Sequence, residues 1–202
     1  MADQTLNVGI LIFDDVEVLD FCGPFEVFAS AGQATGATGD GAPFHVFTVA
    51  ERAEVVHCRG NLLVQPHYII ADHPRIDLLV VPGGWGTRRE VHNPVLLDWI
   101  AAQDRWTTLT LSVCTGAFLL AERGILDGHA ATTHWASIDR LRQGYPQIDV
   151  RDDRRYVDAG HVVTSAGVSA GIDMALYVVS RLCGAEVARA TARRMEYPWT
   201  PD

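Results

Sequence analysis

Apolar runs of strand length alternate with helix-like segments along the chain, and this alternation restricts its possible folds more than any other feature. Residues 6–13 and 76–81 are the clearest runs, and the second ends at the turn-forming sequence Pro82-Gly83-Gly84. Strands that alternate with helices favour a mostly parallel sheet with helices on both faces. The sequence therefore predicts an α/β fold, in which ligands bind beyond the carboxyl ends of the strands.

The other predicted elements continue this pattern to the end of the chain. A surface loop is expected at residues 30–42, which are rich in Gly, Ala and Thr, and residues 1–202 are expected to form a single domain. Further strands are expected at residues 44–49, in one or two short pieces around Gly60 within 55–68, at 107–113 and as a pair within 156–165. Helices are expected at residues 20–29, 94–103 (with Asn93 as N-cap and Pro94 first), 114–124, 135–143, 171–182 and 186–195.

The charge and the hydropathy of the chain exclude several classes of partner. The formal net charge is −9, whereas nucleic acids and anionic membranes require a basic face. No stretch reaches the roughly 18 consecutive apolar residues that a membrane span needs. The polar N-terminus lacks the basic region and the cleavage site of a signal peptide. We therefore expect a cytoplasmic protein that binds a small-molecule substrate, with neither nucleic acid nor membrane as a partner.

The cysteines and histidines argue against a disulfide framework and against a metal site. Cys22, Cys58, Cys114 and Cys183 are far apart and form no CxxC motif, so they are expected to be reduced thiols. The eight histidines are scattered and form neither HxxxH nor HExxH. No metal ion and no organic cofactor is expected.

The sequence Ser112-Val-Cys-Thr-Gly-Ala117 joins a strand to a helix without a loop, so the chain must turn sharply at Cys114. This pattern is typical of a nucleophile elbow, with cysteine as the nucleophile and Gly116 allowing close backbone approach. The sulfur would lie near a helix N-terminus, where free amides and the helix dipole favour the thiolate. The alternative is a small buried cysteine at the end of a core strand. The context favours a reactive thiol at Cys114, whereas the other three cysteines are expected to be structural.

Several motifs together resemble the DJ-1/PfpI superfamily, and their order and spacing match it over nearly the whole chain. They are Phe13-Asp-Asp-Val16, Leu19-Asp-Phe-Cys-Gly-Pro-Phe-Glu-Val-Phe28, Leu78-Leu-Val-Val-Pro-Gly-Gly84, Ser112-Val-Cys-Thr-Gly116, Ala131-Thr-Thr-His-Trp135 and Thr164-Ser-Ala-Gly-Val-Ser-Ala-Gly-Ile-Asp173. The resemblance implies a flavodoxin-like three-layer sandwich of the class I glutamine amidotransferase type, with a mostly parallel central sheet. It also implies a homodimer, because most members of the superfamily are dimers.

The residue after Cys114 distinguishes branches of the superfamily. The protease-like branch usually carries histidine there, whereas this chain has Thr115. The motifs resemble those of the isocyanide (isonitrile) hydratases and of the amidotransferase-like sensor domain of AraC-type transcription regulators. Those regulators continue into a DNA-binding domain, and this chain ends at Asp202 with no room for a helix-turn-helix module. If the chain is complete, the free-standing enzyme is favoured.

The resemblance also implies an acidic partner for Cys114. It assigns that role to Asp20, which would stay protonated beside a thiolate because like charges repel in a low-dielectric pocket. A protonated Asp20 could hydrogen-bond the sulfur and pass a proton to the substrate. The alternative role of Asp20 is that of a helix N-cap. Glu17, one turn earlier, could substitute as the acid.

Three further contributions follow from the same resemblance. Backbone N–H groups of Gly84 or Trp85, with that of Thr115, would form an anion-stabilising hole. The alternative is that Gly83 and Gly84 only form a glycine turn, and a turn at these residues is compatible with an anion-stabilising hole. The Thr115 hydroxyl could also donate a hydrogen bond. His134 resembles a histidine that lies near the cysteine in DJ-1 relatives, where a Cys–His pair could activate the thiol.

The leading functional hypothesis is the hydration of an isocyanide to an N-substituted formamide through a thioimidate on Cys114. The second hypothesis is a small-molecule sensor domain of the AraC-regulator type, which binds a ligand without turnover. A third is another thiol activity of the superfamily, glyoxalase-like or hydrolytic. The absence of histidine at position 115 counts against the amidase form of the third hypothesis.

Overall fold

The computed structural model describes residues 5–34, 36 and 42–200, and its centre is a seven-stranded sheet in the order β10-β11-β7-β6-β1-β2-β5. All neighbouring strands of this sheet are parallel except β10, which runs antiparallel to β11. The short strands β3–β4 and β8–β9 form two separate pairs. The strands are β1 Leu6–Leu11, β2 Phe44–Ala50, β3 Val56–His57, β4 Leu63–Val64, β5 Tyr68–Ile69, β6 Leu78–Val81, β7 Leu109–Val113, β8 Ala130–Ala131, β9 Asp149–Val150, β10 Tyr156–Asp158 and β11 Val162–Ser165.

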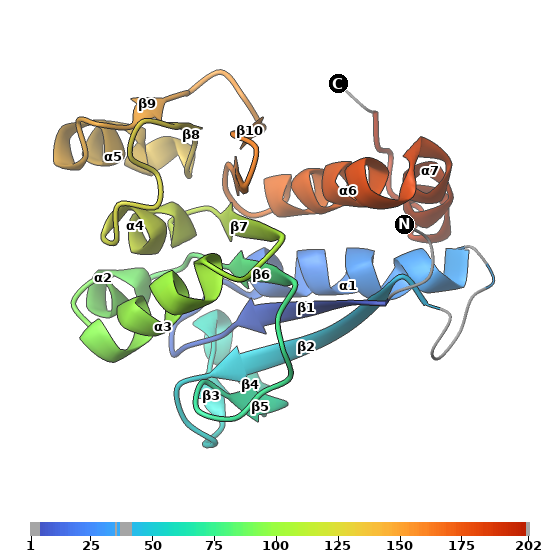
Figure 1. Cartoon of the computed structure of the whole chain (residues 1–202), viewed down its shortest axis with the longest axis horizontal. Coiled ribbons are helices and arrows are strands. Elements are labelled where there is room, and N and C mark those ends of the chain that lie inside the picture. Colours follow the sequence, from blue (N-terminus) through green and yellow to red (C-terminus); the bar gives the residue numbers. More distant parts are fainter. Residues whose placement is uncertain (1–4, 35, 37–41, 201–202) are drawn as a thin grey trace.

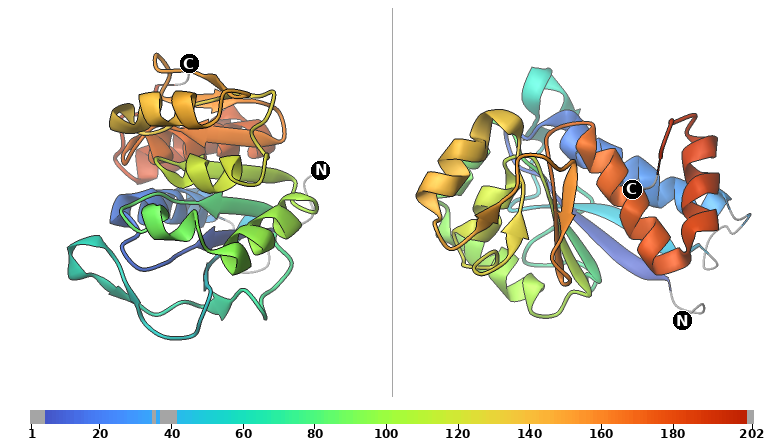
Figure 2. Two further views of the ribbon diagram at one scale, coloured as in Figure 1. Left: turned by 90° about the vertical axis from the view of Figure 1, so that its left-hand side faces the viewer. Right: turned by 90° about the horizontal axis from the view of Figure 1, so that it is seen from above.

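Helices cover both faces of the sheet, which gives the three layers expected of a flavodoxin-like fold (Figures 1 and 2). The blue and red helices α1, α6 and α7 pack together on one face, and the green to yellow helices α2–α5 lie on the other. Their bounds are α1 Val18–Ala34, α2 Thr87–Glu90, α3 Pro94–Asp104, α4 Gly116–Ala121, α5 Ile138–Gly144, α6 Ala170–Cys183 and α7 Ala185–Arg194, with short 3-10 turns at Arg59–Asn61 and Trp135–Ser137.

The central strands are buried along their whole length because helices cover them on both sides. Every residue of β6 and of β7 is buried. This explains why these strands read as continuous apolar runs and not as alternating ones. The predicted α/β fold with a mostly parallel sheet is therefore confirmed. The carboxyl ends of β1, β6 and β7 meet at one edge, and the candidate site lies there.

Several boundaries differ from the expected ones. The first helix starts at Val18 and runs to Ala34, so residues 30–34 belong to it, and the predicted loop is wrong there. The helix continues because Ala31 is fully buried in the core and the Ser30 hydroxyl donates to Glu26 (2.6 Å). Residues 35 and 37–41 of the same predicted loop lie outside the described residues.

Other local expectations are confirmed by the structure. Asn93 caps α3, with its side chain accepting from the Leu96 N–H at 3.3 Å and with Pro94 as the first helical residue. Residues 156–165 form the predicted strand pair. Among the helices that the structure describes, none is long and apolar enough to cross a membrane.

Candidate active site

Cys114 occupies a sharp turn between β7 and α4, as the nucleophile elbow predicts. Its φ is 58°, a left-handed conformation that costs a residue with a Cβ on the order of 1–2 kcal/mol. Hydrogen bonds hold the turn, because the Cys114 N–H donates to the Ser165 carbonyl (3.1 Å) and the Thr133 hydroxyl donates to the Cys114 carbonyl (2.7 Å). A Cβ on Gly116 would lie 2.1 Å from the Val81 carbonyl oxygen, so only glycine fits there.

Asp20 projects from the first turn of α1 and lies fully buried beside Cys114. Its Oδ2 accepts from the Gly83 N–H (3.0 Å) and its Oδ1 accepts from the Val168 N–H (3.1 Å). The Cys114 thiol lies close enough to this carboxyl for each group to shift the pKa of the other. Asp20 is therefore inside the helix and not its N-cap, and its two backbone donors fix the carboxyl against the sulfur.

Burial controls the protonation of this pair. It raises the pKa of Asp20 from 3.8 to about 7, although the hydrogen bonds from Gly83 and Cys114 lower it. Burial, followed by the charge of Asp20, raises the pKa of the Cys114 thiol to about 12. The expected resting thiolate is therefore wrong, because desolvation outweighs the lowering by the Thr115 N–H. Between these two pKa values the pair holds one proton, for which the two groups compete.

The side chain of Thr115 joins the elbow to the glycine turn after β6. Its Oγ1 accepts from the Gly84 N–H at 3.0 Å, and the Thr87 hydroxyl donates to the same oxygen at 3.1 Å. The Gly84 N–H therefore already has a partner in the structure, and its part in the expected anion hole stays a prediction. Gly84 forms an isolated antiparallel bridge with Val16. Trp85, the next residue in the chain, is 56% exposed.

The two remaining candidates have partners other than Cys114. Glu17 pairs with Arg59 (3.4 Å), and its charge contributes to the raised pKa of Asp20. His134 starts the 3-10 turn, where its Nδ1 accepts from the Ala136 N–H (3.2 Å). Its ring packs on Gly167, at which a Cβ would lie 2.2 Å from the ring. Glu17 thus acts on Asp20 through its charge, and His134 has a capping role.

Val168 is the contributor that the sequence analysis missed. It is a β-branched residue with a φ of 55°, a conformation that such residues rarely adopt. This turn directs its N–H at Asp20, so a second strained residue lies at the site besides Cys114. The motif Thr164–Asp173 indicates the family by resemblance, but its residue types do not indicate this contact. Strain at both residues is consistent with a functional site.

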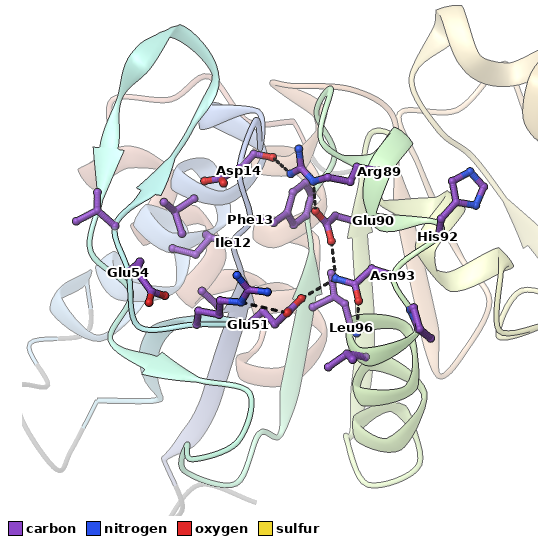
Figure 3. A pocket seen from close by; sticks show the side chains of 16 residues that line it. Ile12, Phe13, Asp14, Glu51, Glu54, Arg89, Glu90, His92, Asn93 and Leu96 are labelled. Atoms are coloured by element: carbon purple, nitrogen blue, oxygen red, sulfur yellow. Dashed lines mark hydrogen bonds and ion pairs between the residues drawn. The ribbon is translucent and has the colours of Figure 1, made fainter.

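A cavity of about 940 Å³ lies near the carboxyl ends of β1 and β2, but it is lined by neither Cys114 nor Asp20. Figure 3 shows the polar network in its wall. The Asn93 amide donates to Glu51 (2.6 Å) and to Glu90 (2.9 Å), and Arg89 donates to Glu90 (2.8 Å). These polar groups satisfy one another's hydrogen-bonding capacity and hold Asn93 in place as the N-cap of α3. The network therefore has a structural role. Within the part of the chain that the structure describes, no three His, Cys, Asp or Glu residues gather as a metal site requires.

Comparison with known proteins identifies the family of the chain. Residues 7–181 match the model of the DJ-1/PfpI family. The chain is 34% identical over 198 residues to the isonitrile hydratase of Pseudomonas putida, covering 98% of this chain and 81% of that protein. It is 25% identical over 191 residues to the HTH-type transcriptional regulator GbdR of Pseudomonas aeruginosa, of which it spans 50%.

Solved structures show the same fold. A ThiJ/PfpI family protein from Pseudomonas syringae superposes with a TM-score of 0.86 at 27% identity, covering 99% of this chain and 78% of that one. An AraC family transcriptional regulator from Pseudomonas putida gives a TM-score of 0.77 at 19% identity, over 94% of this chain and 99% of that one, which is a likeness of fold alone. With its family motifs in order along the chain and its cysteine elbow at the end of β7, this chain belongs to the DJ-1/PfpI family.

Proposed function

We propose that the protein hydrates isocyanides to N-substituted formamides, with Cys114 as the nucleophile. The observation that carries the proposal is the buried Asp20–Cys114 pair at the elbow, in which two backbone N–H groups hold a carboxyl beside a thiol and each group shifts the pKa of the other. The reaction needs such a pair, because the sulfur and the proton of the thiol must both be added to the same carbon of the isocyanide. The similarity to the isonitrile hydratase of Pseudomonas putida supports the same reaction class.

The first half of the reaction adds the thiol to the terminal carbon of R–N≡C. Asp20 takes the thiol proton as the sulfur forms its bond to that carbon. The carbon–nitrogen triple bond becomes a double bond, and Asp20 delivers the proton to the carbon. The product is the thioimidate R–N=CH–S on Cys114, and Asp20 is a carboxylate again. The Gly83 and Val168 N–H groups keep the carboxyl oriented during both transfers.

The second half releases the formamide. Water adds to the C=N carbon, its oxygen forms the new bond, and nitrogen takes a proton. Collapse of this adduct breaks the carbon–sulfur bond and returns a proton to the sulfur, which gives R–NH–CHO and the free thiol. The Thr115 N–H, which lowers the pKa of the Cys114 thiol, stabilises negative charge on the leaving sulfur. The cycle consumes one isocyanide and one water, and it requires no oxidant or reductant.

Turnover of cyclohexyl isocyanide tests the proposal directly. Formamide absorbance should rise with the wild-type protein and should stay at the uncatalysed rate with Cys114→Ala. The matched control is Cys183→Ala, because Cys183 is a half-buried thiol at the end of α6, away from the elbow. Equal turnover by wild type and Cys114→Ala, or none by wild type, would refute the proposal.

A second candidate function is ligand sensing without turnover. The matches to transcription regulators favour it, because this chain is also 38% identical to the regulator CdhR of Pseudomonas aeruginosa over 112 residues, 55% of this chain and 33% of CdhR. A sensor would bind small molecules at the elbow and convert none of them. A panel that includes isocyanides, glyoxals and amides, assayed for both binding and product, separates sensing, hydration and the other thiol activities.

We further propose a cytoplasmic homodimer in which each chain forms a single domain. The support for the dimer is the family. The support for the single domain is the seven-stranded sheet, which joins strands from β1 to β11, and the hydrophobic core that surrounds it. Light scattering should give twice the chain mass of 22.1 kDa, and calorimetry should show one cooperative transition. A monomer, or two separated transitions, would contradict these two points.

A further inference from the structure

Residues of α2, α4 and α5 line a second cavity of about 600 Å³. Figure 1 shows these three helices on the same face of the sheet. The size of the cavity is typical of sites for small molecules. Its apolar wall includes Val91, Phe118 and Tyr145, and its basic wall includes Arg88 and Arg140. The cavity therefore joins apolar surface to two guanidinium groups.

The two guanidinium groups stack on aromatic rings. The Arg88 guanidinium lies 3.9 Å from the centroid of Trp85, and that of Arg140 lies 4.0 Å from the centroid of Phe118. Among the residues that the structure describes, no carboxylate lies within ion-pair distance of either arginine. The chain has 25 acidic residues against 16 basic ones, so carboxylates are abundant. Two arginines that share a cavity and have no ion-pair partner are in the state expected of an anion site.

The electrostatics of the cavity agree with this geometry. Partial burial and the positive charge of Arg88 both lower the pKa of Arg140, so the two guanidinium groups repel each other across the cavity. A bound anion would remove that repulsion. Glu122 also lines the cavity, and its carboxylate accepts a hydrogen bond from the Tyr145 hydroxyl. This single negative charge disfavours ligands of high charge and favours a small anion.

We infer that this cavity binds a small organic anion in which a carboxylate or a phosphate ester is attached to an apolar body. The two guanidinium groups would hold the oxyanion in their planar forks, and the apolar body would contact Val91 and Phe118. Neither Cys114 nor Asp20 lines the cavity. A hydrogen bond from Thr87, which lines the cavity, to Thr115 (3.1 Å) connects its wall to the elbow. The inference is independent of the proposed hydration.

Calorimetric titration with benzoate and phenyl phosphate tests the inference, with neutral benzamide as the probe that lacks the charge. Saturable binding of either anion, about tenfold or more tighter than that of benzamide, is expected because charge-assisted hydrogen bonds contribute most of the difference. The two anions distinguish a carboxylate site from a phosphate-ester site. Failure of both to bind, or equal binding of benzoate and benzamide without binding of phenyl phosphate, would overturn the inference.

Charge-neutral variants locate the binding. Arg88→Gln and Arg140→Gln should each weaken anion binding by about tenfold. Both arginines are exposed, so we expect both variants to fold normally. Arg142→Gln is the matched control, since it removes the same charge from α5 but pairs with Asp139 and Asp152 outside the cavity. Cys114→Ala should leave binding unchanged. Equal weakening by Arg142→Gln, or loss of binding in Cys114→Ala, would place the anion elsewhere and overturn the assignment.

Discussion

Titration of Asp20 should make the folded protein less stable as the pH rises. The folded-state pKa of about 7 is above the ordinary value of 3.8, so folding takes up a proton between these two values. Stability from this group is fully present below about pH 4 and is lost as the pH rises through about 7. Asp20→Asn removes the titration, and its stability should therefore not show this loss.

The size of the effect follows from the pKa difference. One pKa unit corresponds to about 1.4 kcal/mol, so the shift from 3.8 to about 7 represents about 4 kcal/mol in total. Roughly 3 kcal/mol of this loss falls between about pH 5 and about pH 8. The amide side chain introduced by Asp20→Asn would have one acceptor oxygen for the two N–H donors of Gly83 and Val168, which costs about 1–3 kcal/mol. That cost is the same at both pH values and cancels in the comparison.

Urea unfolding at the two pH values measures the difference. The stability of Asp20→Asn relative to wild type should improve by roughly 3 kcal/mol from about pH 5 to about pH 8. Asp72→Asn is the control, because Asp72 is exposed and its substitution should keep the wild-type slope. Parallel pH dependences of wild type and Asp20→Asn, or a relative loss of stability in Asp20→Asn at high pH, would refute the burial argument.

Three further predictions follow from the same site. Isocyanide hydration should rise about tenfold per pH unit below about pH 7 and then level off, because the one-proton state of the Asp20–Cys114 pair is the active one; a rate that falls through pH 7 would contradict this order of transfers. Iodoacetamide labelling of Cys114, followed by peptide mass spectrometry, should accelerate beyond about pH 9, whereas a plateau below about pH 8 would exclude the raised thiol pKa. Gly83→Ala should lower the unfolding free energy by about 2 kcal/mol in urea titrations, since its Cβ would lie 2.5 Å from the Thr115 nitrogen; wild-type stability would disprove the close packing.

Features that depend on neighbouring residues could be predicted from the sequence. The Asn93-Pro94 start of α3 is set by the capping side chain and by proline without an N–H, both of which act within one turn. The elbow at Cys114 is likewise set by the strand that ends at Val113 and by Gly116, which is the residue type that its close contact with Val81 requires. Local chemistry was sufficient in both places.

Features that depend on distant residues could not be predicted in this way. The Val168 N–H meets Asp20 across 148 positions of sequence, and its backbone conformation is unusual for valine. The raised pKa of Cys114 depends on how completely its neighbours exclude water, which no motif states. The use of the Gly84 N–H by Thr115 depends on how closely two turns approach each other. Tertiary packing decided all three.

The central claim is tested most directly by mixing the wild-type protein with cyclohexyl isocyanide, quenching the reaction rapidly and analysing the intact mass and the peptides. The account predicts a transient adduct equal in mass to one isocyanide, carried by the peptide with Cys114 and absent from Cys114→Ala, that decays as formamide appears. Formamide production without any adduct, and at the same rate in Cys114→Ala, would contradict it.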